Sequence, residues 1–274
     1  TMNFAKMFSV EGKIVLVTGG GGGIGKGITA AFVHGGAKVY IASRSDLGPI
    51  ANDLSKYGKG SCHALQCDLS KEDEITKLVE TLNEKEGKLD VLVNNAALGG
   101  YMGKFDKFPM KYFDRMNAVN VRAPFQLIKE CIPLLTTAGV STDQHASVIN
   151  IVSIDGIRIP ADDDWAYGQG KAALIHLTKM LAGRMSNNYG KEKHARKITY
   201  NAIAPGPFPG MLDVFLKTEE GRKAVGGSTV IGRVGRPEDI GASCIYLSSR
   251  AGSYVNGAVL PVDGGGLVGR YANM

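Results

Sequence analysis

Three polar residues in the second half of the chain can together move a proton to or from a carbonyl oxygen. Tyr167 and Lys171 stand four residues apart, and Ser153 precedes them by a short segment. If a helix runs from Trp165 onward, residues i and i+4 share one face, so the ammonium lies beside the phenol. A neighbouring cation lowers the pKa of a tyrosine, which suits Tyr167 to acid/base work near neutral pH, with Ser153 bonded to the reacting oxygen. Such a pair is also common on solvated helix surfaces, so the rest of the chain must show whether this pair is catalytic.

A glycine-rich turn near the start of the chain is typical of a dinucleotide-binding site. The apolar run 13–18 leads into five consecutive glycines, and a helix is predicted over 24–34. Glycine lets the backbone approach a pyrophosphate, and the first N–H groups of the helix face the anion. A flexible linker is the alternative, but a linker has no reason to lie between a buried strand and an apolar helix. The expected cofactor contacts here are Gly19, Gly23, Ile24 and Gly25.

The residues after the second expected strand indicate which nicotinamide cofactor binds. A free ribose 2′-hydroxyl is usually met there by Asp or Glu, but this chain has Ser43 and Arg44. A guanidinium beside a hydroxyl suits a 2′-phosphate through charge-assisted hydrogen bonds. The alternative is that Arg44 is ordinary surface charge and Asp46 binds a free hydroxyl. The sequence favours NADP(H).

Apolar runs separated by helix-length segments indicate the fold class. They predict βαβ units in one α/β domain spanning 1–274, a doubly wound Rossmann-type parallel sheet of about seven strands with helices on both faces. Ligands of this fold bind beyond the carboxyl ends of the strands, where the glycine turn, Asn94, Ser153 and Pro205 all lie. The expected strands are 14–17, 39–42, 62–66, 91–93, 148–152, 198–203 and 259–262.

Composition excludes several classes of function. The formal net charge is +6, but the basic residues are spread along the chain, so we expect no nucleic-acid partner. The densest basic cluster, 191–197, suits either a solvated loop or the binding of a phosphopantetheine or CoA substrate. The four cysteines show no zinc or redox spacing and the five histidines are isolated, so no metal is expected and the cysteines predict buried thiols. Without a signal peptide or a membrane-length apolar run, we expect a cytoplasmic protein.

The ordered motifs resemble those of the short-chain dehydrogenase/reductase superfamily over nearly the whole chain. They include Thr-Gly-x-x-x-Gly-x-Gly at 18–25, Asp68-Leu69, Asn94-Asn95-Ala96, Asn120, Ser153, Tyr167 with Lys171, 201–206 and 262–265. Within the superfamily the chain is most similar to the β-ketoacyl reductase branch, especially the rhamnolipid-biosynthesis type. The segments 8–13, 165–173 and 204–209 carry this closer resemblance.

The resemblance implies a role for each site residue. Asn120 would hold a water in a proton relay, Ser153 would orient the substrate, and Lys171 would bind the nicotinamide ribose while lowering the pKa of Tyr167. It also implies a homotetramer built on the helices that carry Asn120 and Tyr167. Two departures are Ala97, where glycine is usual, and one extra residue between Ser153 and Tyr167. The further cofactor contacts are Asp68, Leu69, Asn95, Ala96, Tyr167, Lys171, Pro205, Gly206 and Phe208.

Together these patterns predict a metal-independent enzyme that transfers hydride from NADPH to a ketone, a β-ketoacyl or related carbonyl compound. Residues 207–235 are expected to form a substrate lid or a surface helix packed on the core. The acidic run 162–164 is expected at the cleft entrance or as helix-start charge, and Trp165 in the core or the pocket wall. Two alternatives are an NADPH-dependent reductase of conjugated C=C bonds, suggested by Asn94–Ala97, and a non-catalytic NADPH-sensing protein.

Overall fold

Seven apolar segments form one parallel sheet in the computed structural model, which describes residues 4–139, 144–160, 163–185, 198–210, 212–213 and 215–269. The strand order is β3-β2-β1-β4-β5-β6-β7, so the chain starts in the middle of the sheet and winds outward in both directions. The predicted doubly wound sheet is confirmed. The strands are β1 (Ile14–Thr18), β2 (Lys38–Ser43), β3 (Ser61–Gln66), β4 (Val91–Asn94), β5 (Ala146–Ile151), β6 (Ile198–Pro205) and β7 (Val259–Val262).

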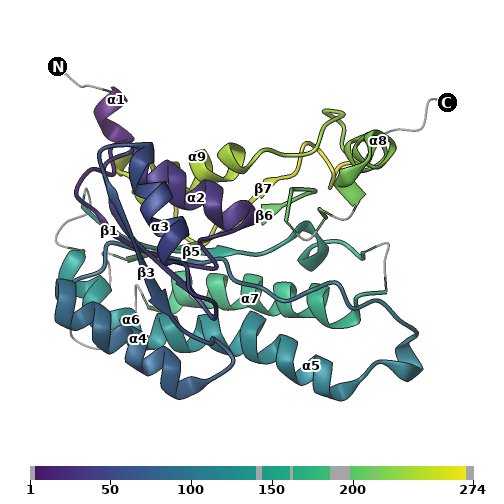
Figure 1. Ribbon diagram of the computed structural model, residues 1–274, viewed down its shortest axis with the longest axis horizontal. Helices are drawn as coiled ribbons and strands as arrows, with labels where there is room; N and C mark the ends of the chain where they lie inside the picture. Colours follow the sequence, from purple (N-terminus) through teal and green to yellow (C-terminus); the bar gives the residue numbers. More distant parts are fainter. Residues whose placement is uncertain are drawn as a thin grey trace.

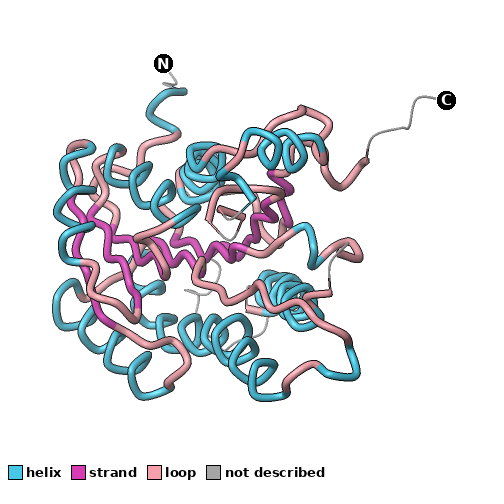
Figure 2. Tube along the Cα trace, turned by 45° about the vertical axis from the view of Figure 1, so that its right-hand side comes forward, coloured by secondary structure: helices cyan, strands magenta, loops and turns pink. Residues whose placement is uncertain are grey.

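Helices cover both faces of this sheet (Figures 1 and 2). Helices α2, α3 and α9 lie on one side, and α4, α5, α6 and α7 lie on the other (Figure 1). The short helix α1 lies near the N-terminus, and α8 lies near the C-terminal end of the described chain. Their bounds are α1 (Phe4–Met7), α2 (Gly23–His34), α3 (Gly48–Leu54), α4 (Glu72–Glu86), α5 (Met110–Asn117), α6 (Ala123–Ala138), α7 (Trp165–Arg184), α8 (Glu219–Gly227) and α9 (Pro237–Ser248).

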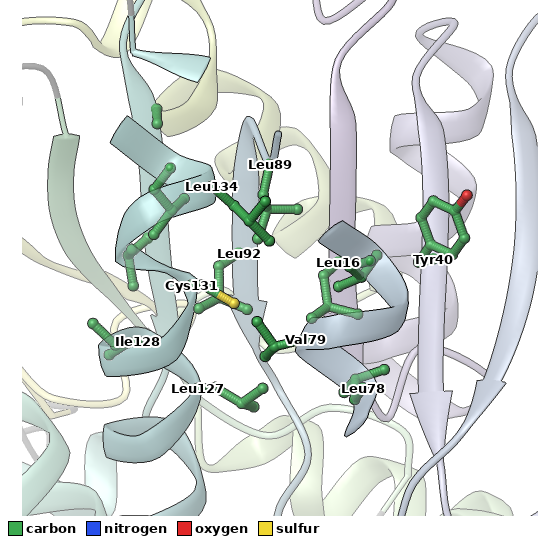
Figure 3. Packing of buried hydrophobic residues seen from close by; sticks show 14 of the residues in the cluster. Leu16, Tyr40, Leu78, Val79, Leu89, Leu92, Leu127, Ile128, Cys131 and Leu134 are labelled. Atoms are coloured by element: carbon green, nitrogen blue, oxygen red, sulfur yellow. The ribbon is translucent and has the colours of Figure 1, made fainter. Parts of the chain in front are cut away.

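Each strand sends alternate side chains into the two helical layers, because successive residues of a strand point to opposite faces. In β1, Leu16 packs toward α4 and α6, whereas Val15 and Val17 pack toward α2 and α9. Both faces are therefore dry, which explains why the strands read as continuous apolar runs. Figure 3 shows the α4 and α6 side of this packing around Leu92.

Helix α4 illustrates how the sequence selects a helix and its orientation. Three acidic residues in its first turn complement the positive end of the helix dipole, and Gly87 ends the helix with a φ of 64°. Its apolar residues recur at i, i+3, i+4 and i+7, which places one stripe against the sheet. Truncating one of these side chains, such as Leu82, to alanine would cost about 2–5 kcal/mol.

The strand order creates a switch point between β1 and β4. From β1 the chain adds β2 and β3 on one side, and it then adds β4 to β7 on the other. Ligands of open α/β sheets bind at such a point, beyond the carboxyl ends of the strands. The glycine turn after β1 and the segment after β4 meet there.

Some residues for which the sequence made predictions lie outside the ranges that the structure describes. The basic cluster 191–197, Asp162 and two residues of the expected lid, 211 and 214, lie outside the described residues. All four cysteines are buried free thiols, as expected. Within the described ranges, no helix is long and apolar enough to cross a membrane.

Candidate active site

Tyr167 and Lys171 lie on the same face of α7. The Lys171 ammonium is 5.5 Å from the centroid of the Tyr167 ring. The helix begins two residues before Tyr167, where Asp164 caps it by accepting the Tyr167 backbone N–H at 3.3 Å. A carboxylate in this position satisfies a free N–H group and favours the start of the helix. The cap therefore fixes the register of the tyrosine and the lysine on the helix.

The ammonium group of Lys171 is removed from water. The residue is 2% exposed, and Nζ donates a hydrogen bond to the Ile151 carbonyl at 2.8 Å. Burial disfavours the charged form and lowers the pKa of Lys171 to about 8. Because this value is still above 7, the lysine is mainly protonated at neutral pH. Its charge acts on Tyr167 through a poorly screened environment.

Ser153 lies in the loop between β5 and a short 3₁₀ turn, η4 (Ile154–Gly156). This turn packs on α7 so closely that a Cβ at Gly156 would come within 2.8 Å of the Ala172 backbone. The packing brings the serine segment against the turn of α7 that carries the lysine. The Ser153 hydroxyl is buried and accepts the Asp155 backbone N–H at 3.1 Å.

Asn120 lies in a π-helical turn, η3 (Ala118–Arg122), between α5 and α6. Such turns are frequent at functional sites because they widen the backbone and displace its hydrogen bonds. The Asn120 side chain accepts the Leu98 N–H and donates to the Leu98 carbonyl, both at 2.8 Å. Asn120 also packs beside α7, because a Cβ added at Gly170 would lie 3.5 Å from the Cβ of Asn120. The side-chain amide is thus used to hold the segment after β4.

The glycine turn after β1 is packed against the end of β4. A Cβ at Gly25 would come within 2.2 Å of the Gly19 carbonyl oxygen and 2.5 Å of Asn95 Nδ2, so only glycine fits. Asn95 donates from Nδ2 to the carbonyls of Thr18 and Gly19 at 2.8 and 3.2 Å. The Thr18 hydroxyl accepts the backbone N–H groups of Asn95 and Ala96, each at 3.0 Å.

The start of α2 fits a dinucleotide pyrophosphate. Its N-cap is Gly22, and no side chain caps the first turn. The N–H groups at that end, with the helix dipole, are therefore available to an anion. Gly23 and Ile24 belong to this turn and Gly19 precedes it, so the structure brings these expected contacts together.

The residues expected to recognise the 2′-phosphate lie at the ends of β2 and β3. Arg44 is exposed, and its carbonyl accepts a hydrogen bond from Gln66 at 3.0 Å. The pKa of Asp68 is lowered mainly by hydrogen bonds from Ser70, with a contribution from the Arg44 charge. Asp46 is exposed, and its Oδ1 accepts the Gly48 N–H at 2.8 Å, so only part of this carboxylate is used within the turn and the alternative is left to the test by mutation.

The other residues that were expected to contact the cofactor differ in whether their side chains or only their backbones can face the cleft. The side chains of Leu69 and Phe208 are buried in the hydrophobic core, so only their backbones can border the cleft. Pro205 ends β6 at the carboxyl edge of the sheet. Gly206 donates to the Val262 carbonyl at 3.1 Å and packs against Asp263.

For each of two residues at the start of α7, the structure excludes one of the two expected placements. Asp164 caps α7, as the helix-start alternative predicted, but it is buried rather than solvated and also accepts the Gly100 N–H at 2.8 Å. Trp165 is 46% exposed, so it is not a core residue, and it packs edge-on to Phe105 with ring centroids 5.3 Å apart. No local pattern signals either contact, because both join segments more than 55 residues apart.

The chain is similar over nearly its whole length to known reductases. Residues 19–266 match the family described as "Enoyl-(Acyl carrier protein) reductase". The rhamnolipids biosynthesis 3-oxoacyl-(acyl-carrier-protein) reductase of Pseudomonas aeruginosa is 37% identical over 261 residues, which cover 94% of this chain and 97% of that protein.

Solved structures give the same relationship. Pseudomonas aeruginosa RhlG, in an active-site complex with NADP, has a TM-score of 0.88 and 36% identity, and covers 97% of this chain and 100% of its own. The 3-ketoacyl-(acyl-carrier-protein) reductase from Brucella melitensis, complexed with NADH, has a TM-score of 0.81 and 32% identity, and covers 94% of this chain and 100% of its own.

Proposed function

This chain belongs to the short-chain dehydrogenase/reductase superfamily, and we propose that it reduces a β-ketoacyl or related ketone to the secondary alcohol. It is an NADP(H)-dependent oxidoreductase that acts on carbonyl and alcohol groups. The relative named as a 3-oxoacyl reductase supports the substrate class. The observation that carries the proposal is the buried Lys171 ammonium 5.5 Å from the Tyr167 ring.

In this proposal the side chains of the site manage the proton. When bound, the reduced nicotinamide supplies the hydride. Tyr167 donates its phenolic proton to the ketone oxygen as negative charge develops there. The charge of Lys171 favours the resulting phenolate, and the Ser153 hydroxyl donates a hydrogen bond to the same oxygen. The π-helical turn at Asn120 would hold the water that returns a proton toward Lys171.

The cofactor-binding roles are proposals of the same kind. The glycine turn and the start of α2 would hold the pyrophosphate, with Asn95 and Ala96 behind it. Ser43 and Arg44 would hold the 2′-phosphate, with Asp68 and the backbone of Leu69 at the adenine. Lys171 would donate to the nicotinamide ribose, and the backbone of residues 205, 206 and 208 would border the nicotinamide.

Replacing Tyr167 with phenylalanine tests the chemistry. This change removes the proton donor and keeps the ring, so we expect kcat for ketone reduction to fall about a hundredfold or more. NADPH binding, followed by the fluorescence of the bound nucleotide, should change less than threefold. Activity within tenfold of wild type would remove Tyr167 from the mechanism.

A panel of ketones and conjugated alkenes tests the substrate class. We expect NADPH oxidation with β-ketoesters and β-ketoacyl thioesters. The family description names an enoyl reductase, but the intact Tyr167 and Lys171 supply the proton that a developing alkoxide needs. Turnover of enoyl thioesters alone would favour C=C reduction, and tight NADPH binding without any turnover would favour a sensor.

We also propose that residues 207–235 form a lid on a single domain spanning 1–274. The two ends of this segment meet, because the Gly235 N–H donates to the Pro207 carbonyl at 2.9 Å and the Phe208 ring packs on Gly235. Between them, α8 contacts mainly the neighbouring 3₁₀ turn, η6 (Phe215–Lys217). The segment is also held near its end, where the Ile231 N–H donates to the Gly264 carbonyl at 3.0 Å, so the part that can move without disturbing the core is η6 and α8. Slower amide exchange in α8 on adding NADPH and substrate analogue would support the lid, and unchanged exchange would oppose it.

A homotetramer is the assembly that we propose. The outer faces of α5, η3, α6 and α7 border an open, largely apolar hollow of about 470 Å³. Phe125, which is 55% exposed, lines it with Val121 and Leu177, and the charged residues Asp114 and Arg122 also line it. Exposed apolar surface of this kind is typical of subunit interfaces. Light scattering should give the mass of four chains, and Phe125→Asp should give a smaller species. A monomeric wild-type protein would contradict the proposal.

We further propose a cytoplasmic location. It is supported by four buried cysteines without disulfides, as in proteins of reducing compartments. Recovery of the native protein in a secreted or periplasmic fraction would contradict it.

A further inference from the structure

The segment between β4 and α5 begins at Asn95, one of the proposed cofactor contacts, and runs out along the N-terminal half of α7 (Figure 1). Residues 95–104 form no helix or strand, so side chains from other elements must hold their conformation. Asn120 holds both backbone groups of Leu98 at 2.8 Å. This contact ties the start of the segment to the π-helical turn.

Two adjacent residues at the start of α7 hold the next part of the segment. Asp164 Oδ2 accepts the Gly100 N–H at 2.8 Å, and Trp165 Nε1 donates to the Gly103 carbonyl at 2.8 Å. Gly100 has a φ of 89°, a conformation in which other residues are strained. The glycine therefore lets the backbone direct its N–H at the carboxylate.

Asp164 divides its two oxygens between two functions. Oδ1 accepts the backbone N–H of Tyr167 itself, and Oδ2 accepts Gly100. The side chain is buried at 7% exposure, so each of these bonds is protected from competing water. One carboxylate thus joins the backbone of Tyr167, the proposed proton donor, to the irregular segment that contains Gly100.

The cofactor side of the same segment has a separate anchor. Thr18 holds the N–H groups of Asn95 and Ala96 to the end of β1. Loss of the Gly100 contact therefore leaves residues 95 and 96 in place. A change at Asp164 should therefore disturb the binding of the ketone more than the binding of the nucleotide.

We propose that Asp164 is a positioning residue that fixes segment 98–103 relative to Tyr167 and so orients the ketone for proton transfer. The inference rests on the proposed ketone reduction. It predicts that the KM and kcat for the ketone change while the Kd for NADPH does not. The reason is that a shift of segment 98–103 misplaces the substrate but leaves NADPH binding intact.

Asp164→Asn separates the two functions of the carboxylate. Asparagine remains a good N-cap, but the two N–H groups face different oxygens of Asp164, so in asparagine one of them meets the amide oxygen and the other meets the NH₂ group. We expect the KM for a β-ketoester to rise at least fivefold and kcat to fall, while the Kd for NADPH stays within twofold. Asp163→Asn is the matched control, because Asp163 is exposed and carries the same charge one residue earlier. It should leave all three constants within twofold.

Gly100→Ala tests the same contact from the other partner. Alanine is strained at this φ, although no atom lies within 4 Å of the added methyl group. Gly87→Ala is its control, since Gly87 has a φ of 64° and equally open surroundings at the end of α4. Both variants should lose similar stability, but only Gly100→Ala should raise the KM for the ketone.

The outcomes are distinct. Ketone KM and kcat within twofold of wild type in both Asp164→Asn and Gly100→Ala would overturn the inference, as would an equal rise in the Kd for NADPH. Amide exchange provides a readout without turnover: peptides covering 98–103 should exchange faster in Asp164→Asn than in Asp163→Asn. If wild type reduces no ketone, the proposed function fails, and equal exchange in these two variants would separately refute the contact.

Discussion

The two halves of the site are built in different ways. At the cofactor end, the glycine turn, Thr18 and Asn95 are joined by hydrogen bonds of 2.8–3.2 Å between backbone and short side chains. At the ketone end, a segment without regular structure is held by long-range side-chain contacts, and large apolar residues such as Met102 and Phe105 remain exposed. Because the cofactor end continues directly from β1 and β4, we expect it to be rigid. The ketone end can vary with few changes to the core, which suits substrate choice.

The largest effect that separates the two halves should come from Gly25→Ala. The added Cβ meets the backbone of Gly19 and the amide of Asn95, so the turn must shift. Overpacking of about 1–3 kcal/mol corresponds to roughly a 5- to 150-fold loss of NADPH affinity. Fluorescence titration measures this loss.

Gly183→Ala serves as the control, because nothing lies within 4 Å of a Cβ at this position in α7. Unchanged NADPH affinity in Gly25→Ala would show that the glycine turn is not rigid, and the contrast between the two halves would be lost.

A smaller effect on the cofactor end should come from Arg44→Glu. Losing charge-assisted hydrogen bonds to the 2′-phosphate should reduce the preference for NADPH over NADH about tenfold or more. The ratio of kcat/KM for the two nucleotides measures it. Lys59→Glu, at the opposite end of β3, makes the same charge change and should leave the ratio alone. An unchanged ratio in Arg44→Glu would return the recognition to Asp46.

The cofactor end and the pairing of Tyr167 with Lys171 could be predicted from sequence, whereas the contacts of segment 98–103 at the ketone end could not. Residues 13–34 form strand, turn and helix in one stretch, so apolar periodicity and glycine spacing contain the information. The contact between Asp164 and Gly100 joins residues 64 positions apart, and it depends on the path of an irregular segment. The acidic run 162–164 predicted charge at the helix start, which Asp164 provides, but it gave no sign of the contact with Gly100. Leu69 and Phe208 show the reverse limit: motif position places them at the site, but packing turns their side chains into the core.

The pH dependence of ketone reduction tests the central claim, that the charge of Lys171 makes Tyr167 an effective proton donor. The pKa of Lys171 is lowered to about 8, so its charged fraction falls as the pH rises above 8. With saturating NADPH, kcat/KM for the ketone should be level below pH 7 and should fall about tenfold per unit well above 8. Lys171→Met should be at least a hundredfold slower at pH 7 and should lack this fall. A wild-type rate that stays level to pH 10, or a Lys171→Met enzyme within tenfold of wild type at pH 7, would contradict the account.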